Sequence, residues 1–183
     1  MSTAFSPAQL RASLWAREGG HVYAVIDGGV VPGIAERLAG ADVAGWDCLH
    51  RGALNAAAAA SAPYLVQLKS VSTFTDWLLG EAADAFACWG VLAMSGQAIL
   101  PMREHCRTIG EVLTPDGQRR PWRWYDPEVL RTILPTLLPG QLDELFAGGQ
   151  GLVVVEAAAW TRFSIEQGVL AVDTRRVMAA ASR

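Results

Sequence analysis

The chain has 183 residues, of which 51% are hydrophobic and 18% charged, and its formal net charge is −3. These values allow one sizeable core and do not require a second domain, so we expect a single domain over residues 1–183. A protein that follows a phosphate backbone needs a basic surface, so the acidic balance argues against nucleic acid as a partner.

The first half of the chain alternates between helix and strand signals. A helix is predicted to begin at Ser6-Pro7 and to end before Gly19-Gly20. An apolar run rich in β-branched residues predicts a buried strand over 22–26, and further strands are predicted over 46–49, 63–68 and 89–94. Further helices are predicted over 32–38, 73–85 and 101–109. The alanine-rich segment 53–62 is compatible with either helix or loop.

The second half begins with strong turn chemistry. Thr114-Pro115-Asp116-Gly117 predicts a hairpin whose return strand is 122–125. Asp126-Pro127-Glu128 begins a helix, which Pro135 kinks or ends, and a short helix follows around 142–146. Later strands are predicted over 152–158, 161–165 and 169–172. The whole pattern predicts an α/β fold: a mixed β-sheet flanked by helices, with a C-terminal β-meander.

The loop from Asp27 to Gly33 joins a predicted strand to a predicted helix. Its outer glycines have the spacing of a phosphate loop, but Ile34-Ala35 stands where lysine and a hydroxyl residue are needed. The loop therefore leaves two readings open. One is a small nucleotide-binding enzyme, and the other is a tight turn in which Asp27 caps the next helix.

Metal and catalytic motifs are weak in this sequence. Cys48 and His50, with His105 and Cys106, are ligand types that suit zinc, but their spacing is too cramped for a standard site. No serine elbow is present, and neighbouring helix carboxylates do not share a face. We therefore expect no enzyme activity, no metal and no cofactor.

The expected location is the cytoplasm. Three sparse cysteines fit a reducing compartment rather than a disulfide framework. No secretory signal is visible, and the longest apolar stretches are shorter than the ~20 residues that span a bilayer, so no membrane partner is expected.

Several segments, in order, resemble the type VI secretion effector-adaptor (effector chaperone) domain family. Segment 23–29 resembles its opening strand, 62–68 its second signature and 77–79 the helix that follows. The blocks 115–117 and 123–127 resemble its most distinctive part. The resemblance extends over about 20–165. The residues that carry it are Tyr23, Asp27, Gly28, Pro63, Tyr64, Trp77, Asp116, Gly117, Arg123, Tyr125, Asp126 and Pro127.

The helix over 101–109 departs somewhat from the family pattern. The family has a His-Leu-Arg-like segment there, and either Arg103 or Arg107 is its equivalent in this chain. Many members also carry an extra C-terminal helical lobe, which this chain is expected to lack.

The resemblance implies a non-catalytic adaptor, which binds a toxic effector protein and helps load it onto the spike protein (VgrG). Such binding uses an aromatic patch with a polar rim, and the candidate contacts are Trp15, Trp46, Trp89, Trp122 and Trp160. The motif residues have a structural reading as well: a buried Arg123–Asp126 pair fixes a junction, while Tyr23 and Tyr64 lie in the core. A stand-alone oligomerising scaffold is a further alternative.

Overall fold

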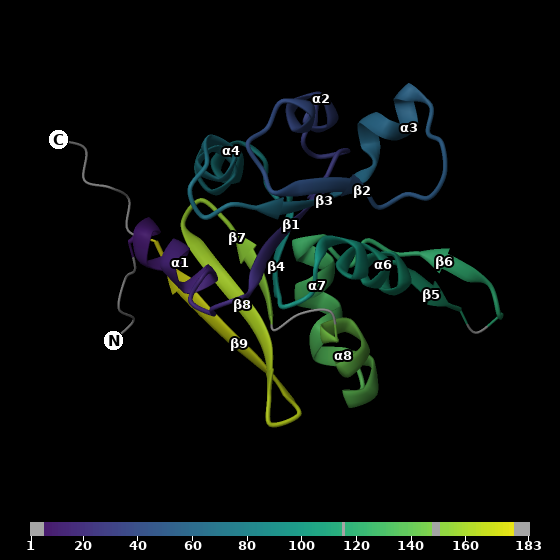
Figure 1. Ribbon diagram of the computed structural model, residues 1–183. Coiled ribbons are helices and arrows are strands. Elements are labelled where there is room, and N and C mark those ends of the chain that lie inside the picture. Colours follow the sequence, from purple (N-terminus) through teal and green to yellow (C-terminus); the bar gives the residue numbers. More distant parts are fainter. Residues whose placement is uncertain (1–5, 115, 148–150, 178–183) are drawn as a thin grey trace.

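A seven-stranded sheet in the order β2-β3-β1-β4-β7-β8-β9 forms the centre of the structure (Figure 1). This computed structural model describes residues 6–114, 116–147 and 151–177. The sheet strands are β1 (His21–Asp27), β2 (Gly45–Cys48), β3 (Pro63–Leu68), β4 (Gly90–Ser95), β7 (Gly151–Val155), β8 (Ala159–Glu166) and β9 (Val169–Arg176). A separate ribbon projects to one side and consists of β5 (Glu111–Leu113) and β6 (Arg119–Pro121).

All pairs within the sheet are antiparallel, although a mixed sheet was expected. The reason lies in the crossovers. The connections from β1 to β2 and from β3 to β4 each join strands that run in the same direction but lie two positions apart. An antiparallel strand fills each gap, so same-direction strands never touch. The α/β architecture and the C-terminal meander β7-β8-β9 are confirmed.

The helices lie in the connections and beside the sheet. They are α1 (Pro7–Leu14), α2 (Ile34–Ala39), α3 (Ala56–Ser61), α4 (Thr73–Trp77), α5 (Ala83–Ala85), α6 (Ile99–Ile109), α7 (Pro127–Ile133) and α8 (Pro139–Phe146). The alanine-rich segment, which the sequence left open, includes α3 because Asn55 Oδ1 accepts the Ala58 N–H at 2.8 Å and caps it. In the described part of the chain, no helix is long and apolar enough to cross a bilayer.

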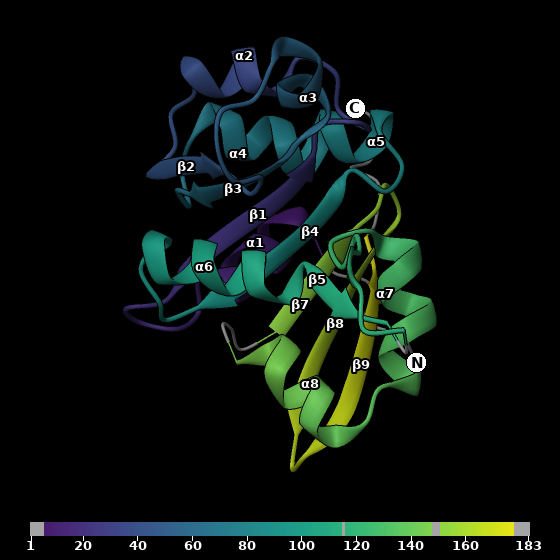
Figure 2. The ribbon, with the colours of Figure 1, turned by 90° about the vertical axis from the view of Figure 1, so that its right-hand side faces the viewer.

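Helices cover both faces of the sheet. Val22, Ala24 and Ile26 of β1 pack in the cluster that holds the buried residues of α1, α2 and α4. Tyr23 and Val25 pack in the opposite cluster, with α6, α7 and α8 (Figure 2). Because both faces are buried, the central strands are apolar throughout instead of alternating with polar residues.

Apart from shifts at the ends of elements, two sequence predictions change. The return strand of the hairpin is Arg119–Pro121 and not 122–125, because Trp124 and Tyr125 are buried in the core and leave the exposed ribbon. The helix predicted over 73–85 is divided into α4, a π-helical turn (Leu78–Ala82) and α5. Pro115 lies outside the described residues.

Candidate functional site

An ion pair at the end of β1 joins two motif segments that are 96 residues apart. Asp27 Oδ2 accepts from Arg123 Nη2 at 2.6 Å, and Asp126 Oδ2 lies 3.2 Å from the same nitrogen. The Asp27 side chain is 7% exposed, whereas that of Arg123 is 52% exposed. The sequence predicted the Arg123–Asp126 contact, but its arginine is not buried, and the shorter contact, to Asp27, was missed.

The loop after β1 is closed by its own polar groups. Asp27 Oδ1 accepts the Gly29 N–H at 2.8 Å, and the Asp27 carbonyl accepts the N–H groups of Val30 and Val31 at 3.0 and 2.9 Å. The Gly28 N–H donates to the Ala62 carbonyl at 3.0 Å. The N–H groups of four consecutive residues, 28–31, are therefore already hydrogen-bonded within the protein. The Asp27 carboxylate also lies beside them. A phosphate needs free amides and no nearby negative charge, so this geometry opposes the nucleotide alternative.

Asp27 does not cap α2, contrary to the structural reading of the sequence. The residue before that helix is Gly33, which makes no side-chain cap. The Asp27 side chain instead turns back onto Gly29, because the loop is too long for it to reach the first turn of the helix.

Gly28 is required by close packing. A Cβ at this position would lie 2.6 Å from the Ala62 carbonyl oxygen and 2.8 Å from that of Ala60. Both are backbone atoms, which cannot move aside cheaply. The strand β3 begins at Pro63, paired with Asp27, so the missing side chain lets the segment after α3 lie against the end of β1.

The segment after Trp122 connects this ion pair to the core. Trp124 is buried, and its Nε1–H donates to the Cys106 carbonyl at 3.3 Å. Burial, together with the Asp27 carboxylate, raises the pKa of Tyr125 to about 12. Asp126 Oδ1 caps α7 by accepting the Glu128 N–H at 2.9 Å. The predicted helix start is confirmed.

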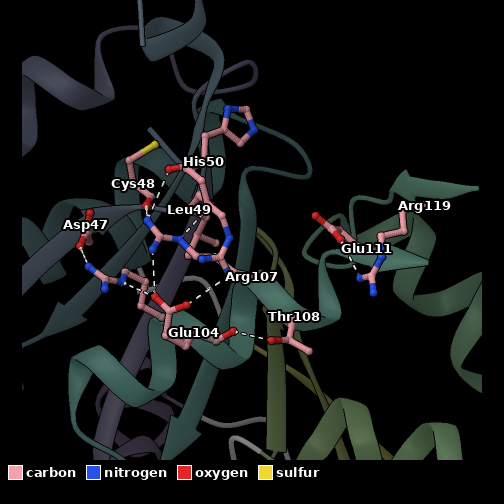
Figure 3. A network of polar contacts seen from close by, with 11 residues as sticks. Asp47, Cys48, Leu49, His50, Glu104, Arg107, Thr108, Glu111 and Arg119 are labelled. Carbon is pink, nitrogen blue, oxygen red and sulfur yellow. Dashed lines mark hydrogen bonds and ion pairs between the residues drawn. The ribbon is translucent and has the colours of Figure 1, made fainter. Parts of the chain in front are cut away.

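A second network holds the loop that follows β2 (Figure 3). Arg107 of α6 donates to the carbonyl oxygens of Cys48, Leu49 and His50 at 2.8, 3.1 and 3.4 Å, and to Glu104 at 3.0 Å. One guanidinium thus satisfies three successive carbonyls. Arg103 pairs with Asp47 instead, at 2.5 Å, so of the two candidate arginines Arg107 is the one that shapes this loop.

The two networks border one open cleft with a volume of about 770 Å³. Its walls come from the end of β1, the loop after β2, the start of β3, α6 and the base of the β5–β6 ribbon. The residues that line it include Asp27, Leu49, His50, Arg51, Leu54, Pro63, Arg107, Glu111, Pro121, Trp122, Arg123 and Tyr125. The sequence pointed to seven of these (Asp27, His50, Pro63, Arg107, Trp122, Arg123 and Tyr125), although His50 was singled out only as a candidate metal ligand. Leu54 and Arg51 carry no local motif, so they could not be found from spacing.

Other motif residues lie away from the cleft. The Tyr23 hydroxyl donates to the Gln97 carbonyl at 2.6 Å, and that of Tyr64 to the Ala59 carbonyl at 2.8 Å. Both rings are buried, as expected. Trp77 packs against Phe74, and the Arg37 guanidinium lies 4.0 Å from its ring centre.

The tip of the β5–β6 ribbon holds the two remaining turn residues. Gly117 has φ +77°, and Asp116 accepts from the Thr114 hydroxyl. Both are exposed, so they shape the turn, as the Asp-Gly sequence predicts.

The candidate metal ligands do not gather. The His105 ring bonds the Leu145 carbonyl on α8 at 3.2 Å, while Cys48 is the last residue of β2. Burial raises the pKa of the Cys106 thiol to about 12, and it also raises the pKa of Cys48. Among the residues that the structure describes, no group of three or more His, Cys, Asp and Glu side chains is placed to hold a metal ion.

The candidate contact tryptophans differ in exposure. Trp89 and Trp160 are buried, Trp15 and Trp122 are half-buried, and Trp46 is 41% exposed. Of these five, only Trp122 lines the cleft, where its Nε1–H donates to the Ile109 carbonyl.

Comparison with known proteins identifies the family of the chain. No curated protein and no solved structure matches it significantly. The model of a family described as a domain of unknown function, DUF4123, matches residues 22–144. This range is more than half of the chain and contains Asp27, Arg123 and the helices between them, so the chain belongs to the DUF4123 domain family.

Proposed function

We propose that this chain is a non-catalytic adaptor, which binds a type VI secretion effector and helps load it onto the spike protein (VgrG). The observation that carries the proposal is the meeting of Asp27, Pro63, Arg123 and Tyr125 at one open cleft. These residues come from separate segments that resemble the adaptor family. A cytoplasmic location belongs to the same proposal.

The polar groups of the cleft support binding more than chemistry. Asp27 is bonded to Arg123 and Gly29, and Arg107 is bonded to three carbonyls and a carboxylate. Nucleophilic catalysis needs a nucleophile that is hydrogen-bonded to a base or has a lowered pKa, whereas the pKa of the Cys48 thiol is raised. These side chains therefore hold loops in place.

The composition of the cleft resembles a protein interface. Trp122, Leu54 and Pro63 supply apolar area, and the half-exposed Arg123 adds a charged donor beside them. Tryptophan and arginine are the residues most enriched at the energetic centres of interfaces. A protein segment that inserts an apolar side chain between the ribbon and the loop after β2 would fit this surface.

Co-expression with candidate effector proteins, beginning with any toxin found to be encoded beside this chain, tests the proposal. We expect the toxin to co-purify with the wild type. Trp122→Ala should weaken the complex by roughly tenfold or more, as truncation of a central aromatic residue does. Trp46→Ala is the matched control, because Trp46 is exposed but lies outside the cleft.

The outcomes separate two parts of the proposal. If the wild type captures no toxin, the adaptor role is contradicted. If Trp46→Ala weakens the complex and Trp122→Ala does not, the adaptor role stands and its placement at the cleft is contradicted. Thermal melting of both variants checks that each remains folded.

A further inference from the structure

The outer strand β9 offers an edge that the proposed function does not use. It pairs with β8 over its whole length, and no strand among the described residues pairs with its other edge. Val169 is 67% exposed and Val172 is 56% exposed. A long edge strand without proline and with exposed apolar residues is open to pairing with another strand.

The register of the β8–β9 hairpin decides which backbone groups face outward. Gln167 and Gly168, with φ of 53° and 79°, form a two-residue turn, so Glu166 and Val169 form a hydrogen-bonded pair. Odd-numbered residues of β9 therefore bond to β8, and the Val177 N–H, which donates to the Ala158 carbonyl at 2.9 Å, continues this series. The even-numbered residues direct their N–H and C=O groups away from the sheet.

The charges on β9 are complementary to those of a second β9 in one arrangement. Asp173 and Arg175 flank Thr174, and their side chains are 53% and 42% exposed. Suppose that a second β9 pairs antiparallel with the first, with Thr174 opposite Thr174. Asp173 of each copy then lies opposite Arg175 of the other copy. Centring on Asp173 would set two carboxylates opposite each other, and centring on Val172 would set Asp173 opposite Ala171. Opposite charges across a strand pair stabilise it, whereas like charges destabilise it.

We propose that β9 pairs with β9 of a second copy of this chain, antiparallel and centred on Thr174. The outward backbone groups of Val172, Thr174 and Arg176 then form the ladder between the copies. Val172 lies opposite Arg176 of the second copy, whose methylene groups cover it. The same patch serves both copies, as a two-fold interface requires.

Mixing two charge variants tests this pairing directly. Within one chain Asp173 Oδ2 already pairs with Arg175 Nε at 2.7 Å, so a single variant changes internal contacts too. Asp173→Lys leaves two cations in each copy at this edge, and Arg175→Glu leaves two anions. Each variant alone therefore sets like charges opposite each other, whereas a mixed pair sets opposite charges together.

The measurement is the molar mass from light scattering over roughly two orders of magnitude in protein concentration, because the fraction of dimer rises with concentration. We expect the wild-type mass to rise from 19.6 kDa towards twice that value, each variant to stay at one chain, and an equimolar mixture to recover the doubled mass. Arg119→Glu, on the β5–β6 ribbon, should behave as the wild type. Thermal melts confirm that the variants are folded.

A wild-type mass of one chain at every concentration would overturn the proposal. So would a dimer that survives both variants, or a mixture that stays monomeric. None of these results affects the adaptor proposal, which concerns a different surface and a different partner.

Discussion

The ion pair between Asp27 and Arg123 is the contact that the structure makes most testable. Asp27→Ala removes the 2.6 Å bond to Arg123 and the 2.8 Å bond from the Gly29 N–H. Gly29 is exposed, so its freed amide can bond to water at little cost. The main loss is the charged bond to Arg123, and with it the link between the loop after β1 and the segment before α7.

The expected cost is about 2 kcal/mol. Hydrogen bonds to charged groups contribute about 1.5–3 kcal/mol. After the change Arg123 keeps Asp126 at 3.2 Å and its half-exposed side chain regains water, and both effects lower the value. For a chain of this size, 1 kcal/mol changes the melting temperature by about 2–4 °C. Asp27→Ala should therefore lower it by about 4–8 °C.

A double-mutant cycle with Arg123→Ala measures the pair itself. Denaturant unfolding of the wild type, the two single variants and the double variant should give a coupling of about 1 kcal/mol or more. The matched control is the Arg131–Glu156 pair, 2.8 Å long with both side chains more than a third exposed, whose coupling should be about 0.5 kcal/mol. If the free-energy costs of the two single variants sum to that of the double variant to within about 0.3 kcal/mol, the pair does not hold the two segments together.

Three further predictions follow from burial. Leu130→Ala, at a fully buried site in α7, should cost about 2–5 kcal/mol in denaturant unfolding, while Leu138→Ala, at an exposed site, should cost less than about 0.5 kcal/mol; equal costs would contradict the packing of α7. Burial raises the pKa of Tyr23 and Tyr125 from 10.0 to about 12. The folded state therefore keeps protons that the unfolded state has lost, and the free energy of unfolding should fall as pH rises from about 10 to about 12; an absorbance titration with a full tyrosine step near pH 10 in folded protein would refute this. Cys106 should resist a thiol reagent at neutral pH until the chain unfolds, because burial raises its pKa to about 12; rapid labelling of folded protein would contradict the buried position.

Local chemistry made much of the fold predictable from the sequence. The buried strands follow from short apolar runs, and the start of α7 follows from Asp126-Pro127, because these signals act within a few residues. Strand direction could not be obtained in this way. It depends on which strands lie side by side after each crossover, and no local signal encodes that choice.

In the candidate site, too, contacts between residues close in the sequence were predictable and contacts between distant residues were not. The sequence brought Arg123 and Asp126 together because they lie three positions apart. It missed Asp27 as the second partner of Arg123, since 96 residues separate the two. The return strand was predicted too late in the chain, because Trp122 and Trp124 are residue types common both in exposed hairpin strands and in buried cores. In the structure Trp124 is buried in the core, and the return strand ends before it, at Pro121.

Hydrogen–deuterium exchange of the chain, alone and with the effector protein that the proposal requires, tests the docking surface most directly. If the cleft binds the partner, amides should gain protection in segments 49–54, 110–111 and 121–125, which border it. Those of α2 and the π-helical turn, on the opposite side of the sheet, should exchange unchanged. Protection confined to those distant elements, with the cleft segments unaffected, would contradict the account.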